Sequence, residues 1–212
     1  LAFTRGMQSV GVLGSAKHFP GHGDTAKDSH KTLPTINFTA NRLNEVELYP
    51  FRILSKEVAS VMVGHLNVPS LEPKQGLPSS LSKAIITDLL KTKMHYQGLI
   101  FTDALGMKGV SEYLPVGEVE VEAFLAGNDI LLMPANLPKG FEAMKKAYEK
   151  KRISEERLAH SVKKILAAKY KVGLTSFTPI DEATLKEQLL TEEDDLLTEV
   201  LFENALTVAQ NK

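Results

Sequence analysis

Residues 10–30 are VGVLGSAKHFPGHGDTAKDSH, an apolar run that leads into a polar, glycine-bent loop. The apolar run is typical of a buried strand, and we expect a short strand over residues 12–16. The loop at 17–30 carries three of the six histidines of the chain and two of its aspartates. Loops that follow buried strands hold the catalytic residues of many α/β enzymes. The stretch therefore predicts an α/β fold with a functional site at the end of this strand.

The strand–helix pattern recurs along the chain. Further apolar segments at 60–64, 98–102 and 129–133 predict three more buried strands. Apolar residues at helical spacing predict helices over residues 2–9, 41–58, 82–94, 117–126, 138–150 and 154–170. Continuously apolar strands that alternate with helices form parallel sheets covered by helices. Four strands cannot close a filled barrel, so we expect either an open sheet or half of an eight-stranded barrel.

Composition excludes several classes of protein. The chain has 212 residues, a net charge of −1, and no cysteine. This charge gives no indication of nucleic-acid binding, and no apolar run approaches the roughly 18 residues of a membrane span. Without cysteine, disulfides and thiolate metal sites are excluded, but the compartment is not fixed.

Asp103 directly follows the apolar segment 98–102, in the sequence FTDALGMKG. A carboxylate at the end of a strand is held on a rigid element, where it can serve as a nucleophile, a general base or a metal ligand. Asp is also a favoured N-cap, so it can instead begin the turn at 104–110. Position alone favours neither interpretation.

Asp28 and His30 are two residues apart, and in an extended segment they lie on the same side. An aspartate bonded to one imidazole nitrogen fixes the tautomer and raises the basicity of the other nitrogen. Such a pair can transfer protons near neutral pH. The alternative is an Asx-turn beside an exposed histidine.

Three further residues are candidate ligands for a substrate. Lys17 and His18 follow the first expected strand and can donate hydrogen bonds to sugar hydroxyls or acidic groups, while His65 ends the second. For Lys17 and His18, the alternative is that they are ordinary polar residues of a loop. For His65, the alternative is a histidine at the edge of the core whose hydrogen bonds are satisfied within the protein. A zinc site is a separate hypothesis, since imidazole and carboxylate suit that metal, although no recognised ligand spacing supports it. Its ligands would come from His18, His22, Asp24, Asp28 and His30.

The stretch at 17–30 resembles the signature of glycoside hydrolase family 3, in particular its β-N-acetylglucosaminidase branch. The shared pattern is Lys-His-Phe-Pro-Gly-His-Gly, four residues, and then Asp-Ser-His. The segment 101–109 is similar to the nucleophile segment of that family, and the likeness extends from about residue 3 to residue 173. A signature with many fixed positions at fixed spacing rarely arises by chance.

The resemblance implies a (β/α)8-type barrel of which this chain carries the last four βα units. It implies that Asp103 is the nucleophile, that His30 is the general acid/base with Asp28 as its partner, and that Lys17 and His18 bind the sugar. The implied reaction releases terminal β-linked N-acetylglucosamine from cell-wall (muropeptide-type) or related glycosides with retention. It needs no metal or organic cofactor, and the implied partner is the carbohydrate alone.

Two departures from the family pattern matter. Ala104 stands where the family commonly has a second acidic residue, and no position corresponds to the substrate-binding aspartate and arginines of the first barrel half. We expect residues 1–175 to form the partial barrel. We expect residues 176–212 to form an acidic helical linker that leads, through a strand at 204–209, into a further domain. A phosphorylase with the same residues, a metal-dependent hydrolase and a non-catalytic fragment remain alternatives, and the oligomeric state stays open.

Overall fold

The structure is a computed structural model that describes residues 1–25, 28, 31–189 and 191–210. The chain divides into two compact units, Leu1–Leu174 and Thr175–Lys212. The first unit holds all of the candidate site residues.

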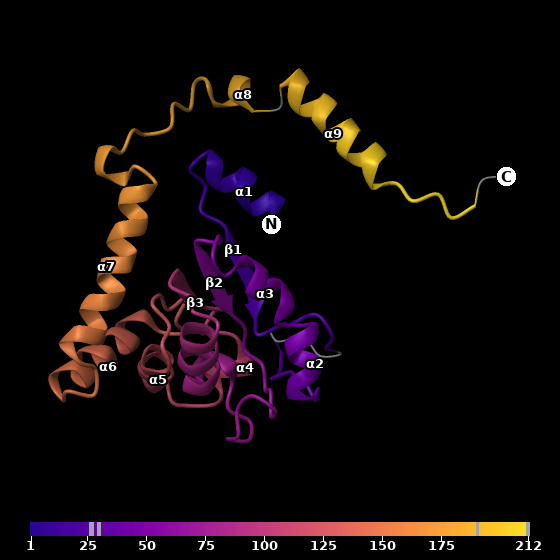
Figure 1. The fold of residues 1–212 in the computed structure, drawn as a ribbon. Coiled ribbons are helices and arrows are strands. Elements are labelled where there is room, and N and C mark those ends of the chain that lie inside the picture. Colours follow the sequence, from indigo (N-terminus) through magenta and orange to yellow (C-terminus); the bar gives the residue numbers. More distant parts are fainter. Residues whose placement is uncertain (26–27, 29–30, 190, 211–212) are drawn as a thin grey trace. The chain divides into compact units, whose positions relative to one another are not determined.

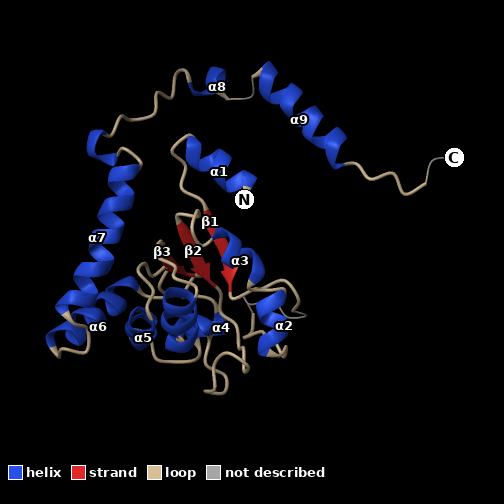
Figure 2. Cartoon of the chain, in the orientation of Figure 1, coloured by secondary structure: helices blue, strands red, loops and turns tan. Residues whose placement is uncertain are grey.

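Three parallel strands form the sheet of the first unit. They are β1 (Ser15–Phe19), β2 (Ser60–Val63) and β3 (Leu99–Thr102), paired in the order β1-β2-β3 (Figure 2). The second and third strands were predicted in place, whereas β1 begins three residues later than expected. Val12 is 49% exposed and Gly11 has a φ of +84°, so the chain turns before the strand begins.

The fourth expected strand, at 129–133, is reduced to a single parallel bridge between Ile130 and Phe101. Thr102 N donates to Ile130 O at 3.0 Å, but Leu132 N then donates to the Thr102 side chain instead of a backbone carbonyl. Met133 adopts a φ of +42°, which turns the chain away before Pro134. The chain therefore lies beside β3 as expected without continuing the strand ladder.

Helices precede and follow each strand of this sheet in the first unit (Figure 1). Between the strands lie η1, a 3-10 turn, and η2, a helix of π type. The described elements are α1 (Ala2–Ser9), α2 (Ala40–Glu45), α3 (Tyr49–Leu54), η1 (Ser79–Leu81), η2 (Ala84–Lys93), α4 (Lys108–Ser111), α5 (Glu118–Ala126), α6 (Leu137–Glu149) and α7 (Glu155–Lys171).

Helix boundaries follow from capping side chains. Thr39 caps α2 through its hydroxyl, which accepts from Arg42 N. The expected single helix is interrupted between α2 and α3, so that Pro50 lies in the first turn of α3, where its missing N–H costs nothing. Ser154 caps α7, because its hydroxyl accepts from Arg157 N at 3.1 Å.

The core lies on one face of the sheet. Because strand side chains alternate between faces, Ala16, Val61 and Ile100 point to the same side and pack into one buried cluster. That cluster includes Leu43 and Phe51 from the helices that follow β1. The neighbouring positions on the strands, such as Lys17 in β1, lie on the opposite face and are less buried.

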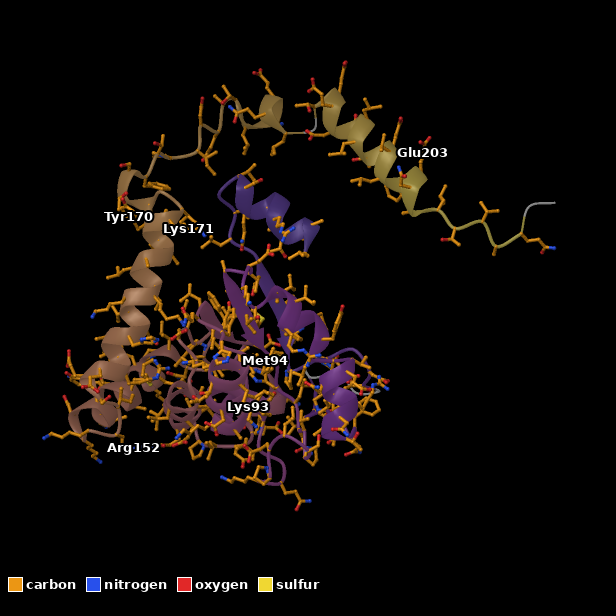
Figure 3. The ribbon with its side chains drawn as sticks, viewed as in Figure 1. Lys93, Met94, Arg152, Tyr170, Lys171 and Glu203 are labelled. Atoms are coloured by element: carbon orange, nitrogen blue, oxygen red, sulfur yellow. The ribbon has the colours of Figure 1, made fainter. Side chains whose placement is uncertain are left out.

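Ionic contacts join the last helices to α5. Arg152, in the connection between α6 and α7 (Figure 3), pairs with Glu118 at 3.1 Å and with Glu122 at 2.9 Å. These three side chains are exposed, so we attribute little stability to them.

The second unit contains η3 (Leu174–Ser176) at its boundary, α8 (Leu185–Gln188) and α9 (Glu192–Ala205). Thr191 and Asp194 cap the start of α9 reciprocally, through the threonine hydroxyl and the aspartate carboxylate. The strand predicted at 204–209 is wrong, because α9 continues to Ala205 and residues 206–209 form no strand. Among the residues that the structure describes, no helix has the length and apolarity needed to cross a membrane.

Candidate active site

Asp103 lies directly after β3, where its backbone and one carboxylate oxygen are held by neighbouring peptide groups. Asp103 N donates to Val63 O at the end of β2 over 2.8 Å. Its Oδ1 accepts from Ala104 N, also at 2.8 Å, so the residue does act as a local cap. The side chain is 16% exposed and therefore still reaches the surface of the site. Asp103 can therefore cap the turn with one carboxylate oxygen and still have a functional role with the other, so the two interpretations of the sequence are compatible.

His18 brings the end of β1 to the same carboxylate. Its Nε2 lies 3.7 Å from Asp103 Oδ2, the oxygen that Ala104 N does not hold. The register between β1 and β2 shifts between Lys17 and Phe19, so that His18 has no partner residue in the ladder. Bulges of this kind redirect side chains beside functional sites. Gly64 leaves room for His18, because a Cβ there would lie 3.2 Å from His18 Cβ.

The end of β1 and the loop after it line a pocket of about 560 Å³ with polar side chains. Lys17, His18, His22 and Asp24 contribute to one wall, and α2 and α3 with their connection contribute the other. His22 is oriented by a 3.0 Å contact between its Nδ1 and Thr25 Oγ1. His18 is the residue that belongs both to this pocket and to the contact with Asp103.

The predicted pair of Asp28 and His30 is described only in part. Asp28 is exposed, and its carbonyl accepts from Lys31 N at 3.0 Å and from Thr32 N at 3.1 Å. His30 lies outside the described residues. The proton-transfer role of the pair stays a prediction. Within the described part of the chain, which leaves out His30, no three acidic or histidine side chains are grouped to hold a metal ion.

His65 lies below the surface of the site and not in it. It is fully buried, with its Nδ1 2.7 Å from Ser80 Oγ and its Nε2 3.0 Å from Ala104 O. Burial lowers the pKa of this imidazole, although the hydrogen bond to Ala104 and the charge of Asp103 oppose the shift. The ring is therefore neutral at neutral pH. This geometry supports the alternative of a satisfied buried histidine, and substrate binding by His65 stays a prediction without structural support.

One charged pair in the pocket was missed by the sequence interpretation. Glu47 is only 7% exposed, and its Oε1 accepts from Arg42 Nη2 at 2.9 Å. The Arg42 guanidinium also stacks over the ring of Phe38, with 4.6 Å between its Cζ and the ring centroid. Gly21 packs against Glu47 with a φ of +134°, and a Cβ there would lie 2.6 Å from Glu47 Cβ. The local sequence contained no signal for its burial, because Glu47 lies in a stretch of mixed polarity two residues after another acid, Glu45.

Comparison with known proteins decides the family. Residues 1–168 match the family model described as the glycosyl hydrolase family 3 N terminal domain. The chain belongs to glycoside hydrolase family 3. A beta-hexosaminidase A of Pseudoalteromonas piscicida is 33% identical over 196 residues, which cover 83% of this chain and 33% of that protein.

Two solved structures have a similar fold. A family 3 beta-N-acetylglucosaminidase from Paenibacillus sp. str. FPU-7 superposes with a TM-score of 0.90 and 37% identity, covering 99% of this chain and 40% of its own. The beta-glucoside phosphorylase BglX superposes with a TM-score of 0.85 and 26% identity, covering 92% of this chain and 37% of its own. The predicted α/β fold, a partial barrel of this family, is confirmed. The chain spans about a third of the length of the sequence relative from Pseudoalteromonas piscicida.

Proposed function

We propose that the protein that carries this chain is a retaining glycosidase that releases terminal β-linked N-acetylglucosamine. The substrate class is a cell-wall (muropeptide-type) or related glycoside. The proposal is supported by family membership and by the names of similar proteins, which include beta-hexosaminidases and a beta-N-acetylglucosaminidase.

The geometry of Asp103 is the observation that carries the proposal. Its Oδ1 is held by Ala104 N, while its Oδ2 lies 3.7 Å from His18 Nε2 at the joint end of three parallel strands. A nucleophilic carboxylate must be fixed so that one oxygen approaches the anomeric carbon in a defined direction. An oxygen held by a peptide N–H, with the other left towards the site, meets that requirement.

The reaction proceeds in two steps. Asp103 attacks the anomeric carbon and forms an ester to it, while the bond to the leaving oxygen breaks and that oxygen takes a proton from His30. His30, now neutral, then removes a proton from water. The water oxygen attacks the same carbon, the ester bond breaks, and N-acetylglucosamine leaves with its β configuration retained.

Asp28 holds the imidazole of His30 in the required tautomer in this proposal. Most retaining glycosidases use a second carboxylic acid for the proton transfer, and that acid needs a raised pKa. An imidazolium is a competent acid near neutral pH without such a shift. Lys17 and His18 donate hydrogen bonds to the sugar. The bond-making and proton-transfer steps of this proposal use Asp103, His30 and Asp28.

Hydrolysis of an aryl β-N-acetylglucosaminide by the full-length protein tests the proposal. Asp103→Asn is expected to lower kcat by more than about 10³-fold, because the amide cannot form the ester. Asp88→Asn is the matched control, since Asp88 is an exposed acid on η2, and it is expected to leave kcat unchanged. Full activity of Asp103→Asn, or a product with inverted configuration, would contradict the proposal.

A phosphorylase is the second candidate, because the beta-glucoside phosphorylase BglX has a similar fold over 92% of this chain. In that reaction phosphate replaces water as the acceptor in the second step. A rate that depends on phosphate, with a sugar 1-phosphate as product, would favour the phosphorylase. A rate independent of phosphate favours the hydrolase.

A further inference from the structure

His65 makes two hydrogen bonds that together define its tautomer. Its Nε2 lies 3.0 Å from Ala104 O, and a carbonyl can only accept, so Nε2 carries the proton. Its Nδ1 then accepts from the hydroxyl of Ser80 over 2.7 Å. Burial lowers the pKa of the ring, which keeps it in this neutral form at neutral pH. His65 is therefore a fixed donor aimed at the carbonyl of Ala104, the residue that follows Asp103.

The peptide that His65 holds is continuous with the one that holds the Asp103 carboxylate. Ala104 N donates to Asp103 Oδ1, and Ala104 O accepts from His65. On either side, Asp103 N donates to Val63 O and Leu105 N donates to Leu132 O, at 2.8 and 2.9 Å. Residues 103–105 are thus tied to both flanking segments by backbone bonds. The Ala104 carbonyl accepts from Met107 N at 3.0 Å and, among the described side chains, from that of His65.

Ser80 ties the imidazole to the long connection between β2 and η2. Ser80 is fully buried, and its carbonyl accepts from Asn128 Nδ2 at 2.9 Å. The adjacent Ser79, equally buried, bonds only backbone groups, donating to Gly64 O at 2.7 Å and accepting from Leu66 N at 3.1 Å. The two serines therefore brace the same connection, but Ser80 alone of the pair contacts the imidazole.

We propose that His65 is a positioning residue that acts through Ala104 to aim the Asp103 carboxylate, with Ser80 fixing the tautomer. This inference rests on the proposed function, in which Asp103 is the nucleophile. Loss of the Nε2 donor leaves the Ala104 carbonyl with Met107 N alone, which lies 3.0 Å from it, and loosens the residue whose N–H holds Asp103 Oδ1. A small misplacement of a reacting group lowers the rate of the chemical step more than it weakens substrate binding.

Two amide substitutions separate the contacts of His65. Gln places its amide nitrogen near the position of Nε2 and can still donate to Ala104 O, whereas the shorter Asn reaches only the position of Nδ1. In the full-length protein, His65→Asn is expected to lower kcat on an aryl β-N-acetylglucosaminide by about tenfold or more, with KM within about twofold. His65→Gln is expected to retain kcat within about threefold. Equal loss of kcat in both variants, in proportion to their loss of melting temperature, would overturn the inference.

The serines provide a second, milder test that does not change the buried ring. Ser80→Ala is expected to lower kcat by about threefold or more, while Ser79→Ala, the matched control, leaves kcat unchanged although both lose stability. Equal kcat in the two serine variants would overturn the inference. Asp103→Asn is measured alongside: if it retains activity, the proposed function fails. If it is inactive while His65→Asn keeps full kcat, the positioning role alone fails.

Discussion

Asp129 is the centre of a buried charge cluster, and its removal is expected to cost more stability than any exposed ion pair. Its carboxylate is fully buried and accepts from Ile100 N at 3.1 Å and from Ser161 Oγ at 2.6 Å. It also pairs with Lys164, and its Oδ1 lies 3.8 Å from Arg157 Nη1. Asp129→Ala leaves two largely buried cations without their counter-charge, for which we expect a loss of about 3–5 kcal/mol in the free energy of unfolding.

Urea unfolding followed by circular dichroism measures this loss at pH 7. Glu118→Ala is the matched control, because it removes an exposed carboxylate from Arg152 and is expected to cost less than about 1 kcal/mol. A loss in Asp129→Ala no larger than in the control would refute the reasoning.

The pH dependence of Asp129 gives the same prediction a second measurement. Burial alone would raise the pKa of Asp129, but hydrogen bonds from Lys164 and Ser161 and nearby positive charge outweigh it, and the pKa lies below 3.8. The stability that Asp129 contributes is present above about pH 4 and is lost as the pH falls through the lowered pKa. Asp129→Asn is expected to lack this loss. If Asp129→Asn lost as much stability at acidic pH as the unmodified protein does, Asp129 would not be the group that titrates there.

Further changes test packing and charge in the first unit by the same unfolding measurement. Gly98→Ala is expected to cost about 1–3 kcal/mol, because a Cβ would lie 2.2 Å from Tyr96 Oη. Gly6→Ala in α1 places its new Cβ where nothing lies within 4 Å, and it is expected to raise the free energy of unfolding by about 0.5–1 kcal/mol. If Gly98→Ala and Gly6→Ala changed the stability in the same direction, this prediction would be contradicted. Burial lowers the pKa of Lys91 from 10.5 to about 8, so the stability from this group falls as the pH drops through that window. Lys91→Met is expected to remove this dependence of stability on pH. It is expected to raise the free energy of unfolding at pH 7 by about 1 kcal/mol, a value that allows for the partial exposure of the lysine. An unchanged pH dependence in this variant would contradict the prediction.

The sequence could predict the strands that are apolar throughout. The segments at 60–64 and 98–102 gave β2 and β3, because continuous hydrophobicity leaves few alternatives for a short buried segment. The prediction for β1 was displaced along the chain, because Lys17 and His18 were assigned to a loop. A strand with one open face can carry such residues at alternating positions, and only the packed structure reveals which face is open.

The candidate site was predictable where its residues follow strands, and unpredictable where they depend on contacts distant in the chain. Asp103 and His18 were singled out by position, and the structure brings them together. The burial of His65 depends on Ser80 and on Ala104, which lie 15 and 39 residues further along the chain. No local sequence pattern encodes such contacts. The hydrogen bond from His65 to Ala104 could therefore be found only in the folded structure.

The central claim, that Asp103 forms a covalent bond to the sugar, can be measured directly. The full-length protein is incubated with a 5-fluoro analogue of β-N-acetylglucosaminyl fluoride, whose good leaving group allows the ester to form and whose ring fluorine slows its hydrolysis. Peptide mapping by mass spectrometry then locates the sugar. One added sugar is expected on the peptide that contains Asp103, and none in Asp103→Asn. A sugar attached to a different carboxylate, or turnover with retention and no adduct on Asp103, would contradict it.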